Sequence, residues 1–266
     1  MYKYFFIFLS IGLLSSCQPK TPRSFYAMYA QAQQANQYLW LNLNYGNTPL
    51  ITDQIKEYKA SGQAAKEDFI LQQCNLLDTS NTFLSYIFLI ENINNSYVFN
   101  PQGELITFSN HKITAGSIRN QLNAIRNHHP QLPDQPREFV STPDSLISLY
   151  NLVLKAHLLY HRYASRTDSL EKALQLLDQS IGIEPYFYNL YLKSKILKAR
   201  QNPEAAHYAR LAIQYGKNAY QKQIYTLLID ELSSEYPPTL ETGKGRMNFK
   251  NYAFWQVPVY LPQPPC

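Results

Sequence analysis

The chain has 266 residues, of which 45% are hydrophobic and 14% aromatic, with 22 tyrosines. This composition excludes a disordered chain, because disordered sequences contain few aromatic residues. The 24 basic and 19 acidic side chains give a formal net charge of +5, and they are scattered along the chain. A small, dispersed positive excess does not indicate a nucleic-acid-binding surface, so we expect no nucleic-acid partner.

The N-terminal residues 1–16 have the pattern of a secretory signal peptide. Lys3 precedes an apolar run over residues 4–14, which is shorter than the about 20 apolar residues that a transmembrane helix needs. The run leads into the sequence Leu14, Ser15, Ser16 and Cys17. These four residues resemble the lipobox of bacterial lipoproteins, in which small residues admit the signal peptidase and the cysteine thiol takes a diacylglyceryl group.

The lipobox resemblance implies that residues 1–16 are removed and that a lipid on Cys17 anchors the chain to a membrane. Gln18 follows the cysteine, which in bacterial lipoproteins implies the outer membrane rather than retention in the inner membrane. The chain resembles a Bacteroidetes-like lipoprotein without that group's acidic surface-export signal, so we expect it to face the periplasm. Residues 17–24 would form the lipidated cysteine and a polar tether that its prolines keep extended.

Residues 25–127 are expected to form a small α/β domain. Composition and periodicity predict helices over residues 25–37, 53–60, 64–77 and 117–126. Apolar or alternating segments predict strands over residues 38–44, 83–90, 96–99 and 104–108. A turn at residues 100–103, with Gly103 supplying a positive φ, would join the last two strands as a hairpin.

The hairpin segment SYVFNPQGELITF, residues 96–108, resembles the terminal hairpin of thioredoxin-like proteins, and SIRNQLNAI, residues 117–125, resembles their last helix. The resemblance implies a thioredoxin-like fold. The family's C-x-x-C motif is absent, because the chain reads NYGNTP over residues 44–49, and Asn95 replaces the usual proline before the hairpin. Thiol–disulfide exchange needs an attacking thiolate and a resolving partner, so we do not expect it here.

Residues 128–143 contain four prolines and are expected to form a linker to a helical region over residues 144–235. Thr142 and Pro143 have the types that favour a helix start. Apolar residues that recur at steps of three and four then predict five amphipathic helices. We expect Gly216 to end the fourth of these helices.

Part of this helical region, LEKALQLLDQSIGIEP over residues 170–185, resembles the second helix of a tetratricopeptide repeat. The motif's small, bulky, small and proline positions hold Ala173, Leu177, Ser180 and Pro185. Ala205 lies 32 residues after Ala173, close to the repeat period of about 34. The resemblance implies about two repeats with a capping helix, and a generic helical bundle is the alternative. The fold class we expect is α+β, with a thioredoxin-like domain followed by a tetratricopeptide-like array.

Stacked helix pairs offer a continuous surface for peptides, and tyrosine-rich walls suit such contacts. We therefore expect a non-catalytic protein-interaction module that binds an envelope protein or peptide. Its groove would be formed by the first helix of each pair, including Tyr160, Tyr191 and Lys195. The Pro-rich and aromatic tail, residues 236–266, would either dock in this groove or bind a partner as a polyproline II segment. Its anchors would be Phe254, Trp255, Val257 and Tyr260.

The sequence contains no recognisable catalytic motif or phosphate-binding loop, so we expect no enzyme, no cofactor and no metal. His157 and His161 lie four residues apart, but without a third ligand we expect them on a polar helix face. An alternative function is an envelope redox accessory that uses a reactive Cys74; this cysteine could instead pair with Cys266. A glycan-binding lipoprotein of an uptake complex is a further alternative.

Overall fold

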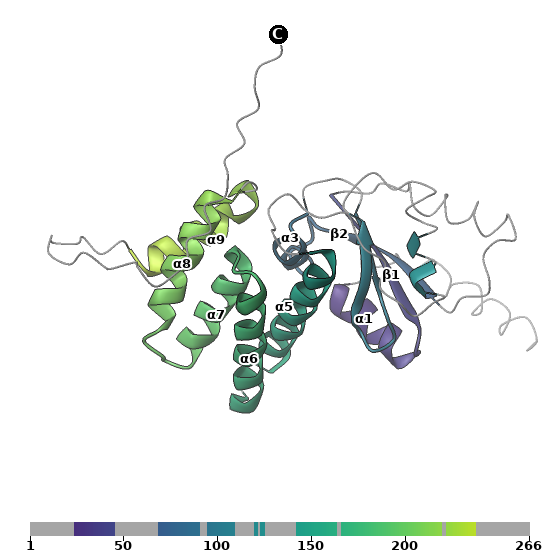
Figure 1. The fold of residues 1–266 in the computed structure, drawn as a ribbon, viewed down its shortest axis with the longest axis horizontal. Coiled ribbons are helices and arrows are strands. Elements are labelled where there is room, and N and C mark those ends of the chain that lie inside the picture. The colour runs from purple at the N-terminus through teal and green to yellow at the C-terminus, as the bar shows by residue number, and fades with distance from the viewer. Residues whose placement is uncertain are drawn as a thin grey trace, which may run out of the picture. The chain divides into compact units, whose positions relative to one another are not determined.

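The computed structural model describes residues 24–45, 69–90, 95–109, 120–121, 123–125, 142–163, 166–219 and 222–237. The chain divides into two units, Met1–Tyr236 and Pro237–Cys266, and the elements discussed below belong to the first. This unit is mixed α+β, with a four-stranded sheet and a set of helices (Figure 1). The lipobox, Cys17 and the four aromatic or apolar tail anchors lie outside the described residues. No helix in the described ranges is both long and apolar enough to span a bilayer.

The sheet has the strand order β2-β1-β3-β4. Its strands are β1 (Tyr38–Asn44), β2 (Phe69–Asn75), β3 (Asn95–Phe99) and β4 (Leu105–Ser109). β1 runs parallel to β2 and antiparallel to β3, and β3 pairs antiparallel with β4. The predicted strand at 38–44 and the predicted hairpin are therefore confirmed. Gly103 in the hairpin turn has a φ of 81°, the left-handed conformation that glycine adopts at low cost.

Alternating residues of β1 face opposite sides of the sheet, as the two-residue period of a strand requires. Leu39, Leu41 and Leu43 are buried in the main core. That core also contains α1 (Phe25–Gln34), α3 (Phe83–Phe88) and the helices that follow. Trp40 points to the other face and packs in a smaller cluster with helical residues 124 and 125. Both faces of β1 are covered, which explains its nearly continuous apolar sequence.

Two predicted elements between residues 64 and 90 are wrong. The predicted helix at 64–77 is the strand β2 over Phe69–Asn75, because this segment pairs along its whole length with β1. The predicted strand at 83–90 is the helix α3 over Phe83–Phe88. A helix that is enclosed on all sides has no polar face, so its sequence reads as the same apolar run as a buried strand.

The helical region is confirmed as five helices in chain order. They are α5 (Pro143–Tyr163), α6 (Thr167–Ile183), α7 (Phe187–Ala199), α8 (Ala205–Asn218) and α9 (Lys222–Glu235). The Thr142 hydroxyl accepts from the backbone N–H of Ser145 at 3.4 Å, in agreement with the predicted helix start. Gly216 does not end α8, which continues to Asn218. A Cβ at residue 216 would lie 2.6 Å from Cδ2 of Phe187 and 2.8 Å from Cδ1 of Ile229, so the glycine allows three helices to pack closely.

The sheet and the helices share one hydrophobic core. This core contains Phe25 of α1 and Phe99 of β3. It also contains Tyr150 of α5, Phe187 of α7 and Tyr225 of α9. The linker and domain boundaries drawn from the sequence stay a prediction, since most of residues 128–143 lie outside the described ranges. The described residues on either side of this segment pack together as one body.

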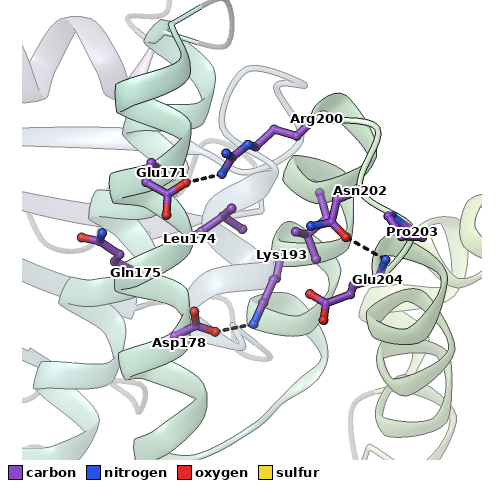
Figure 2. A pocket seen from close by; sticks show the side chains of 10 residues that line it. Glu171, Leu174, Gln175, Asp178, Lys193, Arg200, Asn202, Pro203 and Glu204 are labelled. Atoms are coloured by element: carbon purple, nitrogen blue, oxygen red, sulfur yellow. Dashed lines mark hydrogen bonds and ion pairs between the residues drawn. The ribbon is translucent and has the colours of Figure 1, made fainter.

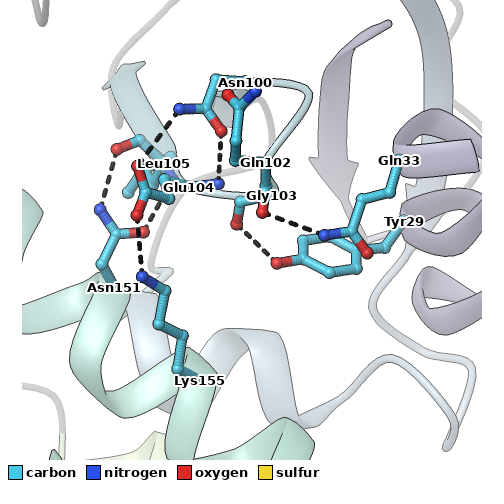
Figure 3. Close-up of polar contacts among 9 residues, drawn as sticks. All are labelled: Tyr29, Gln33, Asn100, Gln102, Gly103, Glu104, Leu105, Asn151 and Lys155. Carbon is cyan, nitrogen blue, oxygen red and sulfur yellow. Dashed lines mark hydrogen bonds and ion pairs between the residues drawn. The ribbon is translucent and has the colours of Figure 1, made fainter. Parts of the chain in front are cut away.

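A set of polar contacts fixes the β3–β4 turn between α1 and α5 (Figure 3). From α1, Tyr29 donates its hydroxyl to the carbonyl oxygen of Gly103 at 2.5 Å, and Gln33 donates to that of Gln102 at 3.0 Å. From α5, Lys155 forms an ion pair with Glu104 at 2.9 Å. The hairpin is therefore held by both α1 and α5, which ties α5 to the sheet.

Candidate functional site

The helices α5, α7 and α9, the first member of each predicted pair and the capping helix, all contact α3. Figure 1 shows α3 between the sheet and α9, beside α5. The Tyr150 hydroxyl of α5 donates to the carbonyl oxygen of Phe88 at 3.3 Å, and the Tyr186 hydroxyl, just before α7, donates to that of Ile87 at 3.2 Å. Part of the surface expected to bind a peptide is therefore covered by α3 of the same chain.

The aromatic side chains of this contact continue onto α9. The ring of Tyr86 in α3 lies 5.8 Å from that of Tyr188 and 6.4 Å from that of Tyr225, measured between ring centroids. Tyr188 and Tyr225 are both buried. These bonds and ring pairs involve the N-terminal parts of α5, α7 and α9, and in the C-terminal half of α5 the Phe83 ring of α3 stacks on His157. The predicted groove residues Tyr160, Tyr191 and Lys195 make none of these contacts.

Of the predicted groove residues, Tyr160 and Lys195 lie in the C-terminal halves of α5 and α7, and Tyr191 lies one turn before Lys195 in α7; all three are partly buried. Tyr191 and Lys195 converge on Glu231 of α9: the Tyr191 hydroxyl donates to its Oε2 at 3.2 Å, and the Lys195 Nζ lies 2.6 Å from its Oε1. Tyr160 interacts electrostatically with Tyr191. The structure thus brings together the three residues that the sequence selected, and we call them with Glu231 and Glu235 the Tyr–Lys–Glu strip.

The two acids of the Tyr–Lys–Glu strip are balanced by Lys195 within it and by Lys198 beside it. Lys195 also forms an ion pair with Glu235 at 3.3 Å, and Lys198 contacts the same carboxylate at 2.9 Å. Burial opposes the charge of Lys195, but hydrogen bonds and charges from Glu231 and Glu235 outweigh it and raise the lysine pKa. Burial, followed by the charge of Glu231, raises the pKa of Tyr191. The strip therefore presents neutral tyrosine and paired charges, a chemistry for binding rather than for proton transfer.

The two acidic members of the strip were missed in the sequence. Glu231 and Glu235 lie four residues apart on α9, a spacing that puts both on one helix face. This spacing is the only sequence signal for them, and it does not tell which residues of α7 they would meet. Their partners follow from the packing of α9 against α7, which a single sequence does not specify.

His157 is buried, which contradicts the expectation of a polar-face histidine, whereas His161 is exposed. The ring of His157 bridges three helices: Nε2 lies 2.8 Å from the Tyr26 hydroxyl of α1, and Nδ1 lies 3.0 Å from the Tyr188 hydroxyl of α7. The Phe83 ring stacks on it with centroids 4.2 Å apart. Burial, with a smaller contribution from His161, lowers the pKa of His157 to about 3. The neutral ring acts as a structural junction.

Both ring nitrogens of His157 are engaged by tyrosines: in the neutral ring one nitrogen donates its N–H and the other accepts with its single lone pair, so no lone pair is left for an ion. Among the described residues there is no group of three or more His, Cys, Asp or Glu side chains arranged to hold a metal. The pair at 157 and 161 therefore does not form a metal centre with other described side chains.

Cys74 is a free thiol in the main core and only 1% exposed. Burial, with a smaller contribution from Asp78, raises its pKa to about 12. At neutral pH such a thiol is almost entirely protonated, whereas redox chemistry uses an accessible thiolate. This environment weighs against the redox alternative that the sequence left open.

Comparison of the chain with protein-family models and with curated proteins gives no match.

Proposed function

We propose that this protein is a lipoprotein of the bacterial cell envelope, anchored through a lipid on Cys17, that acts as a non-catalytic protein-interaction module. Its helical array would bind an envelope protein or peptide across Tyr160 of α5, Tyr191 and Lys195 of α7, and the C-terminal half of α9. Residues 1–16 would be the removed signal peptide, and the anchored chain would face the periplasm from the outer membrane. The observation that carries the binding proposal is the Tyr–Lys–Glu strip, which draws side chains from the three alternate helices α5, α7 and α9.

The packing of the array supports its assignment as tetratricopeptide-like. Ala173, Leu177 and Ser180 of α6 are buried, as are Ala205, Ala209 and Ala212 of α8. Small residues at helix contacts let paired helices approach closely, which is the role that the repeat motif gives them. The outer side of α9 has polar residues at Gln223, Thr226 and Asp230 but also Leu227, which is 76% exposed, so it is not the fully polar face of a capping helix.

The sheet supports the thioredoxin-like assignment of the first region. Its strand order, a parallel pair β2-β1 beside the antiparallel hairpin β3-β4, is the arrangement that the resemblance implies. The segment after β1 contains no cysteine, and the remaining Cys74 is buried. We therefore propose that this region acts as a scaffold, which holds α3 against the array.

The binding proposal is tested by affinity capture from native membranes with the wild-type chain, with Tyr160→Ala, and with Tyr215→Ala as the control. Tyr215 is a 39% exposed tyrosine on α8, outside the strip. A central aromatic contact contributes about 1–2 kcal/mol or more to binding, so we expect roughly tenfold less partner with Tyr160→Ala and no change with Tyr215→Ala. Equal recovery with all three chains would contradict the proposed surface.

The anchor is tested separately by expressing Cys17→Ala and following the chain between membrane and soluble fractions. We expect the wild-type chain to incorporate labelled palmitate and to sediment with membranes, and the variant to do neither, because a single residue carries the lipid. Membrane association of the unlabelled variant at the wild-type level would remove the lipoprotein assignment and leave the binding test unaffected.

A further inference from the structure

A pocket opens on another part of the array, between α6, α7 and the start of α8 (Figure 2). Its volume is about 500 Å³, within the range that small ligands or a long side chain fill. The floor is partly apolar, with Leu174 of α6, Leu197 of α7 and Pro203 of the α7–α8 turn. None of these residues belongs to the Tyr–Lys–Glu strip, so the pocket is a distinct feature of the array.

The two cations of the pocket are already neutralised by acids on α6. Lys193 is paired with Asp178, and Arg200 with Glu171. The side chain of Lys193 is only 8% exposed, and its Nζ also lies 3.9 Å from the centroid of the Tyr208 ring. An anionic ligand would have to displace Asp178 or Glu171, so these cations do not offer an anion site.

The third carboxylate that lines the pocket, that of Glu204, is not paired with either cation. Its backbone N–H donates to Oδ1 of Asn202 at 2.9 Å, but its carboxylate makes no hydrogen bond or ion pair with any described residue. In Figure 2 this carboxylate points from the start of α8 across the pocket toward α6. With three acids and two bases, the lining has one surplus negative charge.

From this geometry we propose that the pocket binds an alkylammonium or alkylguanidinium group, either a free cationic amine or a lysine or arginine side chain of a protein partner. The cationic head would pair with the Glu204 carboxylate. Asn202 also lines the pocket, and its side-chain oxygen, which already accepts the Glu204 N–H, can accept one further N–H group. The alkyl stem would lie along Leu174 and Leu197, as long cationic side chains lie along apolar surface.

The proposal is tested on the full chain by NMR titration with Nα-acetyl-lysine amide, and with Nα-acetyl-norleucine amide as its uncharged counterpart. We expect the lysine compound to shift the methyl resonances of Leu174 and Leu197 and the norleucine compound to leave them unchanged. Glu204→Gln should weaken binding at least tenfold, and Glu204→Asp should retain most of it. Asp168→Asn, an exposed acid on α6 that does not line the pocket, is the matched control.

Two outcomes would overturn the proposal: equal shifts with both compounds, or an unchanged affinity for the lysine compound in a folded Glu204→Gln chain. The source of the ammonium group is resolved by titrating cadaverine and a peptide with one central lysine in parallel. Tighter binding of the peptide supports a partner side chain, and tighter binding of cadaverine supports a free amine. Saturable binding of neither probe would remove both sources. Because the pocket is separate from the Tyr–Lys–Glu strip, these results do not depend on the capture experiment.

Discussion

The side-chain amide of Asn151 on α5 pairs with the backbone of Leu105 at the start of the edge strand β4. It accepts the Leu105 N–H at 2.7 Å and donates to the Leu105 carbonyl oxygen at 2.9 Å (Figure 3). These are the two bonds that a neighbouring strand would make at a hydrogen-bonded pair. One side chain therefore closes part of a sheet edge, which would otherwise offer unpaired groups to another chain.

Replacing this amide is expected to destabilise the fold. In Asn151→Leu both backbone groups of Leu105 lose their partner, and an unsatisfied buried polar group costs about 1–3 kcal/mol. We expect the free energy of unfolding, measured by urea denaturation, to fall by an amount in this range. The free energy of unfolding of Asn151→Asp should lie between those of wild type and Asn151→Leu, because a carboxylate accepts the Leu105 N–H but cannot donate to the Leu105 carbonyl oxygen. Ser148→Ala, at an exposed position of the same helix, should change little; a similar loss there would contradict the specific role of the amide.

The sequence predicts those elements whose signals are local. The strand at 38–44, the hairpin around Gly103 and the five helices after Thr142 each carry a period, a turn residue or a cap within their own segment. The prediction for β2 is wrong because the residues that hold this strand lie far away in the sequence: Phe69 pairs with Tyr38, and Asn75 with Asn44. The strand itself is rich in good helix formers such as Gln and Leu. Tertiary pairing overrides propensity there. α3 fails because a short apolar run has no period that separates helix from strand.

In the candidate site too, the correct predictions rest on local sequence signals and the wrong one on contacts between distant residues. Tyr160, Tyr191 and Lys195 are found from helix position alone, since residues on the first helices of stacked pairs share one side of an array. The exposure expected for His157 is wrong because Tyr26 and Phe83, from elements more than 70 residues earlier, cover it. The apolar period of α5 predicts the helix face that packs on α6. It does not reveal that α1 and α3 cover the face that carries His157.

Two glycines in helices of the array are expected to respond in opposite directions to alanine. A Cβ at Gly182 of α6 meets nothing within 4 Å, so Gly182→Ala should stabilise the protein by up to about 1 kcal/mol through helix propensity. A Cβ at Gly216 would overlap Phe187 and Ile229, and overpacking of this kind costs about 1–3 kcal/mol. Urea denaturation of the two variants checks the pair. A stabilised Gly216→Ala would show that α7, α8 and α9 pack less closely than the structure has them.

Cys74 is expected to be unreactive in the folded protein. Its pKa is raised from 9.0 to about 12, which reduces the thiolate fraction at neutral pH by about a thousandfold, and its burial blocks access as well. In a Cys17→Ser, Cys266→Ser chain, iodoacetamide should label Cys74 at least a thousandfold more slowly than a model thiol. Labelling should become fast in denaturant. A fast reaction in the native state would reinstate the redox alternative.

The stability of the protein is expected to fall in mild acid because of His157. Its pKa is about 3 in the folded chain, against 6.5 for an ordinary histidine side chain, so between these pH values the unfolded chain binds one proton more than the folded chain. Stability therefore decreases as the pH falls below 6.5, by up to about 1.4 kcal/mol per pH unit, and the loss is complete near pH 3. Protonation of the ring would also remove the acceptor for one of the two tyrosine hydroxyls, Tyr26 or Tyr188.

The contribution of His157 is isolated by comparing wild type with His157→Gln in urea denaturation from pH 7 to pH 4. Glutamine does not titrate, so we expect the variant to be less stable at pH 7 but to lose about 3 kcal/mol less than wild type over this range. His161→Gln is the control, because this ring is exposed and should leave the slope nearly unchanged. Equal slopes for wild type and His157→Gln would show that the pKa of His157 is the same in the folded and the unfolded chain, and that the Tyr26–His157–Tyr188 junction does not hold the ring neutral.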